Sequence, residues 1–253
     1  MGDDEDRCRV SQSLGRALQI LASLGEGERS LDQLATELDV HKTTVLRLLR
    51  TMEAERFVRR DAAHRYRLGS RLFALADLAR EQHVVREVAA PHLRELNQRT
   101  GQTVHLAAWE NGEVVYIDKL DSVRSVRMYS QVGVPAALHC TAVGKVLLAA
   151  QPKRQREALL ASMDYHAFTP NTITDRDALR DELDEVRARG WAQDKAEHEA
   201  FINCVGAPVT DHDGRIVGAV SVSVPDVLLN YDQVLELLPE LLATARAISA
   251  DYN

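Results

Sequence analysis

Residues 31–50 read LDQLATELDVHKTTVLRLLR, and this stretch predicts two short amphipathic helices joined by a tight turn. Apolar residues recur at the i, i+3, i+4, i+7 spacing that places them on one face of a helix. These positions are Leu31, Leu34, Ala35 and Leu38 in the first helix, and Val45, Leu48, Leu49 and Met52 in the second. The opposite face of the second helix is basic and hydroxylated, and it carries Lys42, Thr43, Thr44, Arg47 and Arg50.

This arrangement is typical of a helix-turn-helix, whose second helix enters the DNA major groove. Arg can pair with guanine edges, and Thr can contact thymine methyl groups, so the residue types fit that role. The alternative is a pair of ordinary surface helices with a solvated basic face. Spacing alone does not separate the two interpretations, but the flanking sequence favours the first.

A further helix is predicted over residues 11–24, with Leu14, Ala17, Leu18 and Leu21 on one face. Residues 57–69 (FVRRDAAHRYRLG) predict two short strands around a polar turn, with four arginines in the hairpin. This order predicts a winged helix whose basic wing grips phosphate or a minor groove; the alternative is a charged surface hairpin. The predicted DNA-contacting residues are Ser30, Lys42, Thr43, Thr44, Arg47, Arg50, Arg59, Arg60 and Arg65.

Charge is spread unevenly along the 253 residues, whose net charge is −7. Residues 1–6 hold four acids, residues 7–80 hold 14 Lys and Arg against 9 Asp and Glu, and the remainder is acidic. A basic N-terminal module on an acidic body fits a local nucleic-acid footprint. The chain shows no signal peptide, no membrane-spanning apolar run and no zinc-type spacing, and its three cysteines lie far apart. We therefore expect a cytoplasmic protein without disulfides, metal, cofactor or membrane contact.

The rest of the chain predicts a second domain of α+β class. Helices are expected at 68–82, 85–99, 142–150, from a cap at 174–177 to Gly190, and at 231–252. An Asn111-Gly112 turn between two alternating apolar runs predicts a hairpin, and further strands are expected at 125–130, 201–209 and 215–224. We expect an antiparallel sheet with its helices gathered on one side.

Three segments of this domain carry candidate chemistry. Thr141 can cap a helix whose first backbone N–H groups, those of Ala142 and Val143, would attract a carboxylate or phosphate; an ordinary capped helix is the alternative. In residues 191–209, the cluster of Asp194, His198, Glu199 and Cys204 could form a thiol or metal site, although a pocket-lining role for Cys204 is favoured. Ser221 and Ser223 share one face of a strand and could line a polar pocket or face solvent.

From Ser11 to Ala250 the chain resembles the IclR family of bacterial transcriptional regulators. The segments that carry the resemblance are SLGRALQIL, LATELDVHKTTVLRLLRTM, YRLG, VPAALHCTAVGKVLLA, RARGWAQDKAEHEAFINCVGAPV and GAVSVSVP. Several separate motifs in the right order make the resemblance specific.

After the acidic tail (1–10), the resemblance implies a winged helix-turn-helix (11–69), a linker helix (70–84) and a GAF-like effector-binding domain (85–253). It implies homodimers or homotetramers on palindromic double-stranded operators near catabolic genes, controlled by small organic acids. The effector carboxylate would meet the amides of Ala142 and Val143. The motif-matched effector-binding positions are Met128, Ala136, Ala142, Val143, Asp194, Ile202, Cys204, Ser221 and Ser223.

Two positions depart from the family pattern. Asp39 stands where the helix-turn-helix usually has Gly, although Asp can adopt the left-handed conformation. Ala136 stands where bulkier apolar residues are often seen, which suggests a roomier pocket for an aromatic or larger acid.

The favoured function is therefore an effector-controlled transcriptional repressor rather than an enzyme. Two alternatives stay open from the residues: a cysteine hydrolase centred on Cys204 with His139 or His198 as base, and a ligand-sensing scaffold that binds no DNA.

Overall fold

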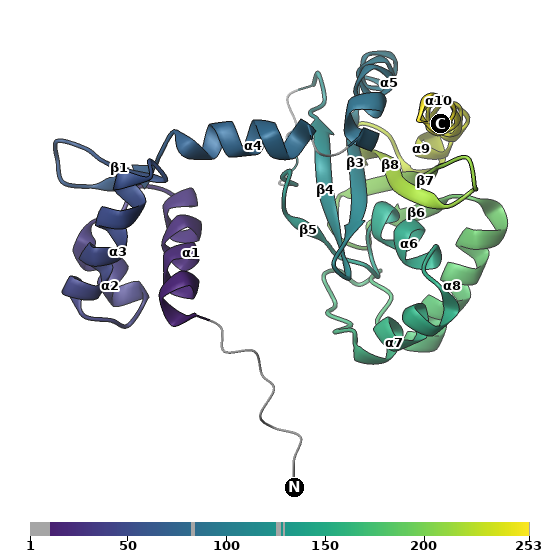
Figure 1. The fold of residues 1–253 in the computed structure, drawn as a ribbon. Coiled ribbons are helices and arrows are strands. Elements are labelled where there is room, and N and C mark those ends of the chain that lie inside the picture. Colours follow the sequence, from purple (N-terminus) through teal and green to yellow (C-terminus); the bar gives the residue numbers. More distant parts are fainter. Residues whose placement is uncertain (1–10, 82–83, 125–127, 129, 253) are drawn as a thin grey trace, which may run out of the picture. The chain divides into compact units, whose positions relative to one another are not determined.

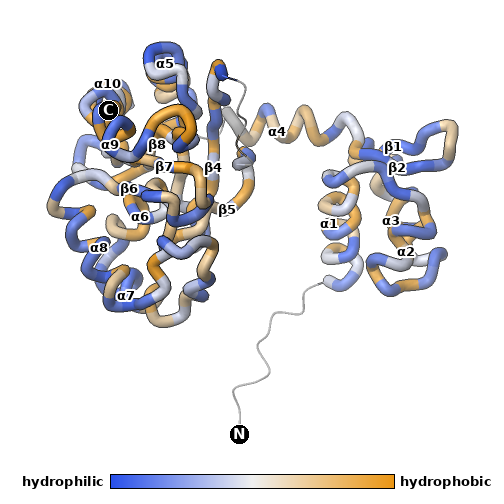
Figure 2. The backbone as a smooth tube through the Cα atoms, turned by 180° about the vertical axis from the view of Figure 1, so that it is seen from behind, coloured by the Kyte–Doolittle hydropathy of each residue, from blue (hydrophilic) through white to orange (hydrophobic). Residues whose placement is uncertain are grey.

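The computed structural model describes residues 11–81, 84–124, 128 and 130–252. The chain divides into two compact units, Met1–Ala79 and Arg80–Asn253. Figure 1 shows the elements of each unit, and Figure 2 shows the hydropathy along them. No helix in these described ranges is long and apolar enough to cross a membrane.

The first unit is a three-helix bundle followed by a small hairpin. The bundle helices are α1 (Gln12–Gly25), α2 (Leu31–Glu37) and α3 (Lys42–Ala54), and the strands are β1 (Val58–Arg60) and β2 (Tyr66–Leu68). Helix α4 (Arg71–Glu81) follows the hairpin and runs across the boundary between the units. Ile20, Leu34 and Leu49 are fully buried where the first three helices meet. The order helix–helix–helix–hairpin confirms the predicted winged helix-turn-helix fold.

Local features of this unit follow from the sequence, with one correction. Asp39 adopts a φ of 50°, the left-handed conformation that the turn between α2 and α3 requires. Arg29 forms an isolated bridge with Tyr66, so the chain before α2 also pairs with the hairpin. The helix predicted to start at Leu68 begins at Arg71, because Leu68 belongs to β2.

The second unit contains one six-stranded antiparallel sheet in the order β5-β4-β3-β8-β7-β6. The strands are β3 (Thr103–Glu110), β4 (Glu113–Leu120), β5 (Pro135–Ala136), β6 (Ala192–Lys195), β7 (Ile202–Thr210) and β8 (Ile216–Pro225). The helices are α5 (Val84–Thr100), α6 (Ala142–Ala149), α7 (Lys153–Ser162), α8 (Arg176–Arg189), α9 (Tyr231–Leu235) and α10 (Leu238–Asp251). The α+β class and the antiparallel sheet are therefore confirmed.

Helices cover both faces of this sheet, so the expectation that they gather on one side was wrong. Leu106 of β3 and its partner Val220 of β8 point into the core that contains residues of α5 and α10. Their neighbours Ala107 and Ala219 point into the opposite core, which contains residues of α6 and α8. Successive residues of a strand face opposite sides, and both sides are apolar here because residues of both faces belong to a buried core.

Several other boundaries differ from those predicted. The C-terminal helix is split into α9 and α10, with Pro239 in the first turn of α10. The cap of α8 is Asp175, whose side chain accepts from Asp177 N and Ala178 N. Strands β5 and β6 and helix α7 were not predicted from the sequence. The strand predicted at 125–130 falls mostly outside the described residues.

Candidate functional site

Helix α3 presents the predicted basic face to solvent. Lys42, Thr43, Arg47 and Arg50 are exposed, and Thr44 is half-buried, while Val45 and Leu49 are buried on the other face. Lys42 Nζ lies 2.8 Å from Asp32 Oδ1 of α2. Arg47 and Arg50 form no ion pair with any described residue, so both guanidinium groups are available to a partner.

The starts of α2 and α3 are fixed by side-chain caps. Ser30 accepts from Gln33 N, and Gln33 Oε1 accepts from Ser30 N, which completes a capping box. The hydroxyl of Ser30, a predicted DNA contact, is therefore used by the helix. His41 caps α3 through Nδ1, which accepts from Thr43 N and lies 2.8 Å from Thr43 Oγ1. This role of His41 was not predicted from the sequence, because His is not a preferred capping residue.

The arginines of the hairpin fall into two groups. Arg59 and Arg60 are exposed, and Arg60 lies over the Tyr66 ring at 5.6 Å. Arg65 Nε lies 3.0 Å from Glu28 Oε1, and Arg67 also pairs with Glu28. Arg65 is thus partly neutralised by its own domain, whereas Arg59 and Arg60 retain exposed charges.

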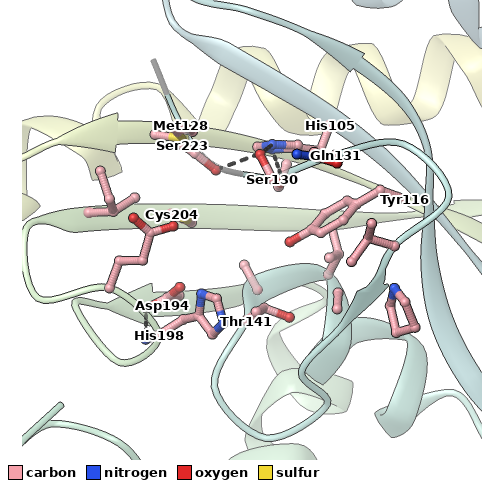
Figure 3. Close-up of a pocket in the computed structure, with 18 residues that line it drawn as sticks. His105, Tyr116, Met128, Ser130, Gln131, Thr141, Asp194, His198, Cys204 and Ser223 are labelled. Carbon is pink, nitrogen blue, oxygen red and sulfur yellow. Dashed lines mark hydrogen bonds between the residues drawn. The ribbon is translucent and has the colours of Figure 1, made fainter. Parts of the chain in front are cut away.

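A cavity of about 440 Å³ opens in the second unit between the sheet and the start of α6. Its lining comes from β3, β4, β6, β7 and β8, from the segment before and within β5, and from the loop after β6. Figure 3 shows His105, Ser130 and Ser223 along one side, and Asp194, His198 and Thr141 along the opposite side. All nine motif-matched positions line this one cavity: Met128, Ala136, Ala142, Val143, Asp194, Ile202, Cys204, Ser221 and Ser223.

The start of α6 supplies hydrogen-bond donors to the cavity. Thr141 Oγ1 caps the helix by accepting from Gly144 N, while the amides of Ala142 and Val143 have no acceptor among the described residues. The helix end packs tightly on the sheet: a Cβ on Gly206 of β7 would lie 3.1 Å from the Ala142 Cβ. Unpaired N–H groups and the helix dipole together favour an anion at this point.

The other side of the cavity is a cluster of hydroxyl groups around His105. His105 Nε2 lies 2.7 Å from Ser130 Oγ, and Nδ1 lies 3.5 Å from Ser221 Oγ and 3.4 Å from Ser223 Oγ. Burial lowers the pKa of His105 to about 3, so the ring is neutral at physiological pH. Ser221 and Ser223 are buried rather than solvent-facing. His105 and Tyr116 were not predicted as site residues, although both lie in the predicted hairpin.

Asp194 is a buried acid at the edge of the cavity. It pairs with Cys204 across β6 and β7, and its Oδ1 accepts from Glu197 N at 2.7 Å and from His198 N at 3.4 Å. Burial raises the pKa of Asp194 to about 7. Glu197 lies in the loop after β6, and its Oε1 lies 2.7 Å from Lys145 Nζ of α6. An ion pair therefore joins α6 to the loop whose backbone amides donate to Asp194.

The chemistry around Cys204 does not fit a thiol nucleophile. Burial raises the pKa of the Cys204 thiol well above its usual value, and burial lowers the pKa of His198. The other proposed base, His139, lies with Nε2 3.0 Å from the carbonyl oxygen of His166. A thiolate, which nucleophilic chemistry requires, is thus disfavoured. Among the described residues, no group of three or more His, Cys, Asp or Glu could hold a metal.

Comparisons with known proteins agree with this architecture. Residues 13–62 match the IclR helix-turn-helix domain, and residues 78–250 match the C-terminal domain of the bacterial transcriptional regulator IclR. The HTH-type transcriptional regulator KdgR of Escherichia coli is 34% identical over 243 residues, covering 95% of this chain and 92% of that protein. The HTH-type transcriptional repressor AllR of Klebsiella pneumoniae is 31% identical over 242 residues, covering 94% and 89%.

A solved structure extends the match to three dimensions. The crystal structure of the Thermotoga maritima IclR matches with a TM-score of 0.82 and 32% identity, covering 95% of this chain and 98% of that one. Fold and sequence thus define a DNA-binding transcriptional regulator, and neither the hydrolase nor the DNA-free scaffold is favoured. The chain belongs to the IclR family, which confirms the resemblance seen in its motifs.

Proposed function

We propose that this regulator represses a catabolic operon and that a small organic acid in the cavity of the second unit controls its DNA binding. The observation that carries the proposal is the convergence of all nine predicted effector-binding residues on one cavity, with the unpaired amides of two of them, Ala142 and Val143, at the start of α6. A carboxylate at those amides satisfies donors that are otherwise unpaired. The Klebsiella pneumoniae relative AllR is a transcriptional repressor, which supports this sign of regulation.

The proposed working assembly is a cytoplasmic homodimer or homotetramer on a palindromic operator. The acidic tail would comprise residues 1–10, the DNA-binding domain 11–69, the linker helix 70–84 and the GAF-like effector domain 85–253. An acid that binds one arrangement of the subunits more tightly than another shifts the balance between them, and by linkage changes the DNA affinity.

The proposed DNA interface consists of the predicted residues on α3 and the hairpin. Arg47 and Arg50 would contact base edges because both are exposed and unpaired among the described residues. Arg59 and Arg60 would contact phosphates, which position the protein but carry no sequence information. Ser30, Lys42 and Arg65 would assist only after exchanging their present partners.

The size of the effector is a further part of this proposal. Ala136 lines the cavity with a single methyl group, which supports a roomy site that admits an aromatic or larger acid. A binding screen in which only two- and three-carbon acids bind would overturn this part.

The decisive experiment is a mobility-shift assay on the DNA upstream of the gene that encodes this chain and of its neighbours. The assay is repeated with sugar acids, keto acids and aromatic acids. A sequence-specific shift that one acid abolishes would support the repressor and define its effector class. A specific shift that no acid changes would overturn the control by organic acids, and no specific shift on any of these sequences would overturn the proposed operators.

Removing the hydroxyl cluster is expected to abolish the effector response while leaving DNA binding intact. The double variant Ser221→Ala, Ser223→Ala deletes two buried hydroxyls beside His105, and Asp194→Ala removes the acid on the opposite side. Losing a hydrogen bond to a buried ligand costs about 1–3 kcal/mol, roughly 5- to 150-fold in affinity. Ser162→Ala, on exposed α7, is the matched control. An unaltered response in both cavity variants would place the site elsewhere.

A further inference from the structure

The cavity that we assign to an acid has no basic side chain in its lining. Its titratable groups are two acids, Asp194 and Glu199, together with His105, His198, Tyr116 and Cys204. The nearby Lys145 is fully buried and holds Glu197 through both carboxylate oxygens, at 2.7 and 2.8 Å. Lys119, beside the opposite wall, donates to the carbonyl oxygens of Met128 and Ser130 at 2.8 Å and pairs with Asp121. An anionic ligand would therefore meet donors at the start of α6 but no cation in the lining that balances its charge.

Asp194 is the buried acid in the cavity lining that a second negative charge would affect. Its side chain lies at the edge of the cavity and is almost fully buried, at 2% exposure. Burial is the main cause of its raised pKa, and the charge of Glu197 acts in the same direction. Two backbone amides and Lys145 oppose this shift without cancelling it. A second carboxylate brought into the cavity would raise the pKa further, because like charges disfavour ionisation.

We propose that the cavity takes up its carboxylate ligand together with one proton, which Asp194 holds as a neutral carboxylic acid that donates to an oxygen of the ligand. The inference rests on the proposed effector site. One ligand anion and one proton from solvent bind at the site of an ionised Asp194. The resulting complex carries a single net negative charge at the site. The regulator would then sense acid and pH together.

The other groups that face Asp194 do not account for such a proton near neutral pH. His105 and His198 have lowered pKa values and stay neutral. The pKa values of Cys204, Cys140 and Tyr116 are raised, so these groups keep their protons. Burial also raises the pKa of Glu197, but Glu197 does not line the cavity, and both of its carboxylate oxygens accept from Lys145 Nζ. Glu199 remains as the competing acid, and it is tested directly below.

The sign of the pH dependence follows from this proton uptake. Below about pH 7 Asp194 is already protonated in the free protein, and the ligand affinity is flat. Above that value each bound anion must take up a proton, so the affinity falls by up to about tenfold per pH unit. An ionised Asp194 without proton uptake would give no such decline.

Isothermal titration calorimetry on the full-length protein tests the inference, with D-gluconate, pyruvate and benzoate as probes. These acids remain ionised from about pH 6 to about pH 9. Titrations in two buffers with different ionisation enthalpies count the protons taken up. At about pH 8 we expect uptake to approach one proton per site. Binding without proton uptake would overturn this inference alone, whereas no binding of any probe at any pH would overturn the carboxylate site together with it.

Variants assign the proton to its residue. Asp194→Asn, a permanent donor, is expected to abolish proton uptake and to bind the acid more tightly than the unmodified protein at about pH 9. Asp181→Asn, an exposed change on α8, is the matched control and should keep the uptake. Uptake that is lost in Glu199→Gln but kept in Asp194→Asn would overturn the assignment.

A ligand-independent measurement keeps the inference testable if Asp194→Asn does not fold. Carbon-13 NMR of labelled Asp carboxyls in the free protein should show one Asp that titrates near neutral pH. Ordinary titration of every Asp carboxyl at acidic pH would overturn the inference.

Discussion

Replacing Lys145 by methionine is expected to lower the free energy of unfolding by about 3–5 kcal/mol. The Lys145 side chain is fully buried, and its ammonium lies within 2.8 Å of both Glu197 carboxylate oxygens and 3.6 Å from Glu182 Oε1. Removing the cation leaves buried Glu197 without its ion pair, which costs far more than the net value of the pair. Folded domains are stable by only about 5–15 kcal/mol, so this is a large fraction.

A double variant separates charge from packing. Lys145→Met combined with Glu197→Gln removes both charges, and we expect it to recover most of the stability lost in the single variant. Lys153→Met, on the exposed start of α7, is the matched control and should change stability by less than about 0.5 kcal/mol. Urea unfolding measures all three. A single variant as stable as the control would contradict the role of the buried pair.

Arg47→Ala is expected to weaken specific operator binding by roughly 5- to 150-fold, because a good Arg–guanine pair contributes about 1–3 kcal/mol. Arg47 is exposed on α3, opposite the buried Val45 and Leu49, so its loss should not disturb the core. Binding to random DNA should change little if Arg47 contacts a base. A uniform loss on all DNA would instead indicate a phosphate contact.

The matched control for this prediction is Arg94→Ala, which removes an exposed arginine from α5 in the second unit. It should leave operator affinity unchanged. Footprinting and competition with random DNA are the measurements, with thermal unfolding to confirm that the variant folds. An unchanged footprint and affinity in Arg47→Ala would reject the assignment of this helix face to DNA.

The features that could be predicted from the sequence are those that depend on residues close together in the chain. The helix-turn-helix was predictable because Leu34, Val45 and Leu49 follow a helical period that a short window of sequence reveals. The Asn111-Gly112 turn was predictable because a two-residue hairpin turn requires positive φ values, which Asn and Gly tolerate. The two residues adopt φ values of 50° and 95°. Such signals are local, and tertiary contacts do not override them here.

The candidate cavity was only partly predictable. Local chemistry singled out the start of α6, the segment around Asp194 and Cys204, and the two serines of β8, and the family resemblance added Met128, Ala136 and Ile202. His105 and Tyr116 were missed because alternation along β3 and β4 does not reveal which face opens into a cavity. The position of helices on both faces of the sheet was also missed. Short strands such as β5 and β6 carry too few residues for a periodic signal, and they form because β4 and β7 offer them an edge.

The sequence by itself determined the winged helix-turn-helix, the basic face of α3 and the α+β class, because these depend on residues close together in the chain. Tertiary structure alone decided that residues from 105 to 223 surround one cavity, that Lys145 is fully buried against Glu197, and that Asp194 has a pKa near neutrality. Burial, and the desolvation that shifts a pKa, depend on contacts between segments far apart in sequence, which local patterns do not encode.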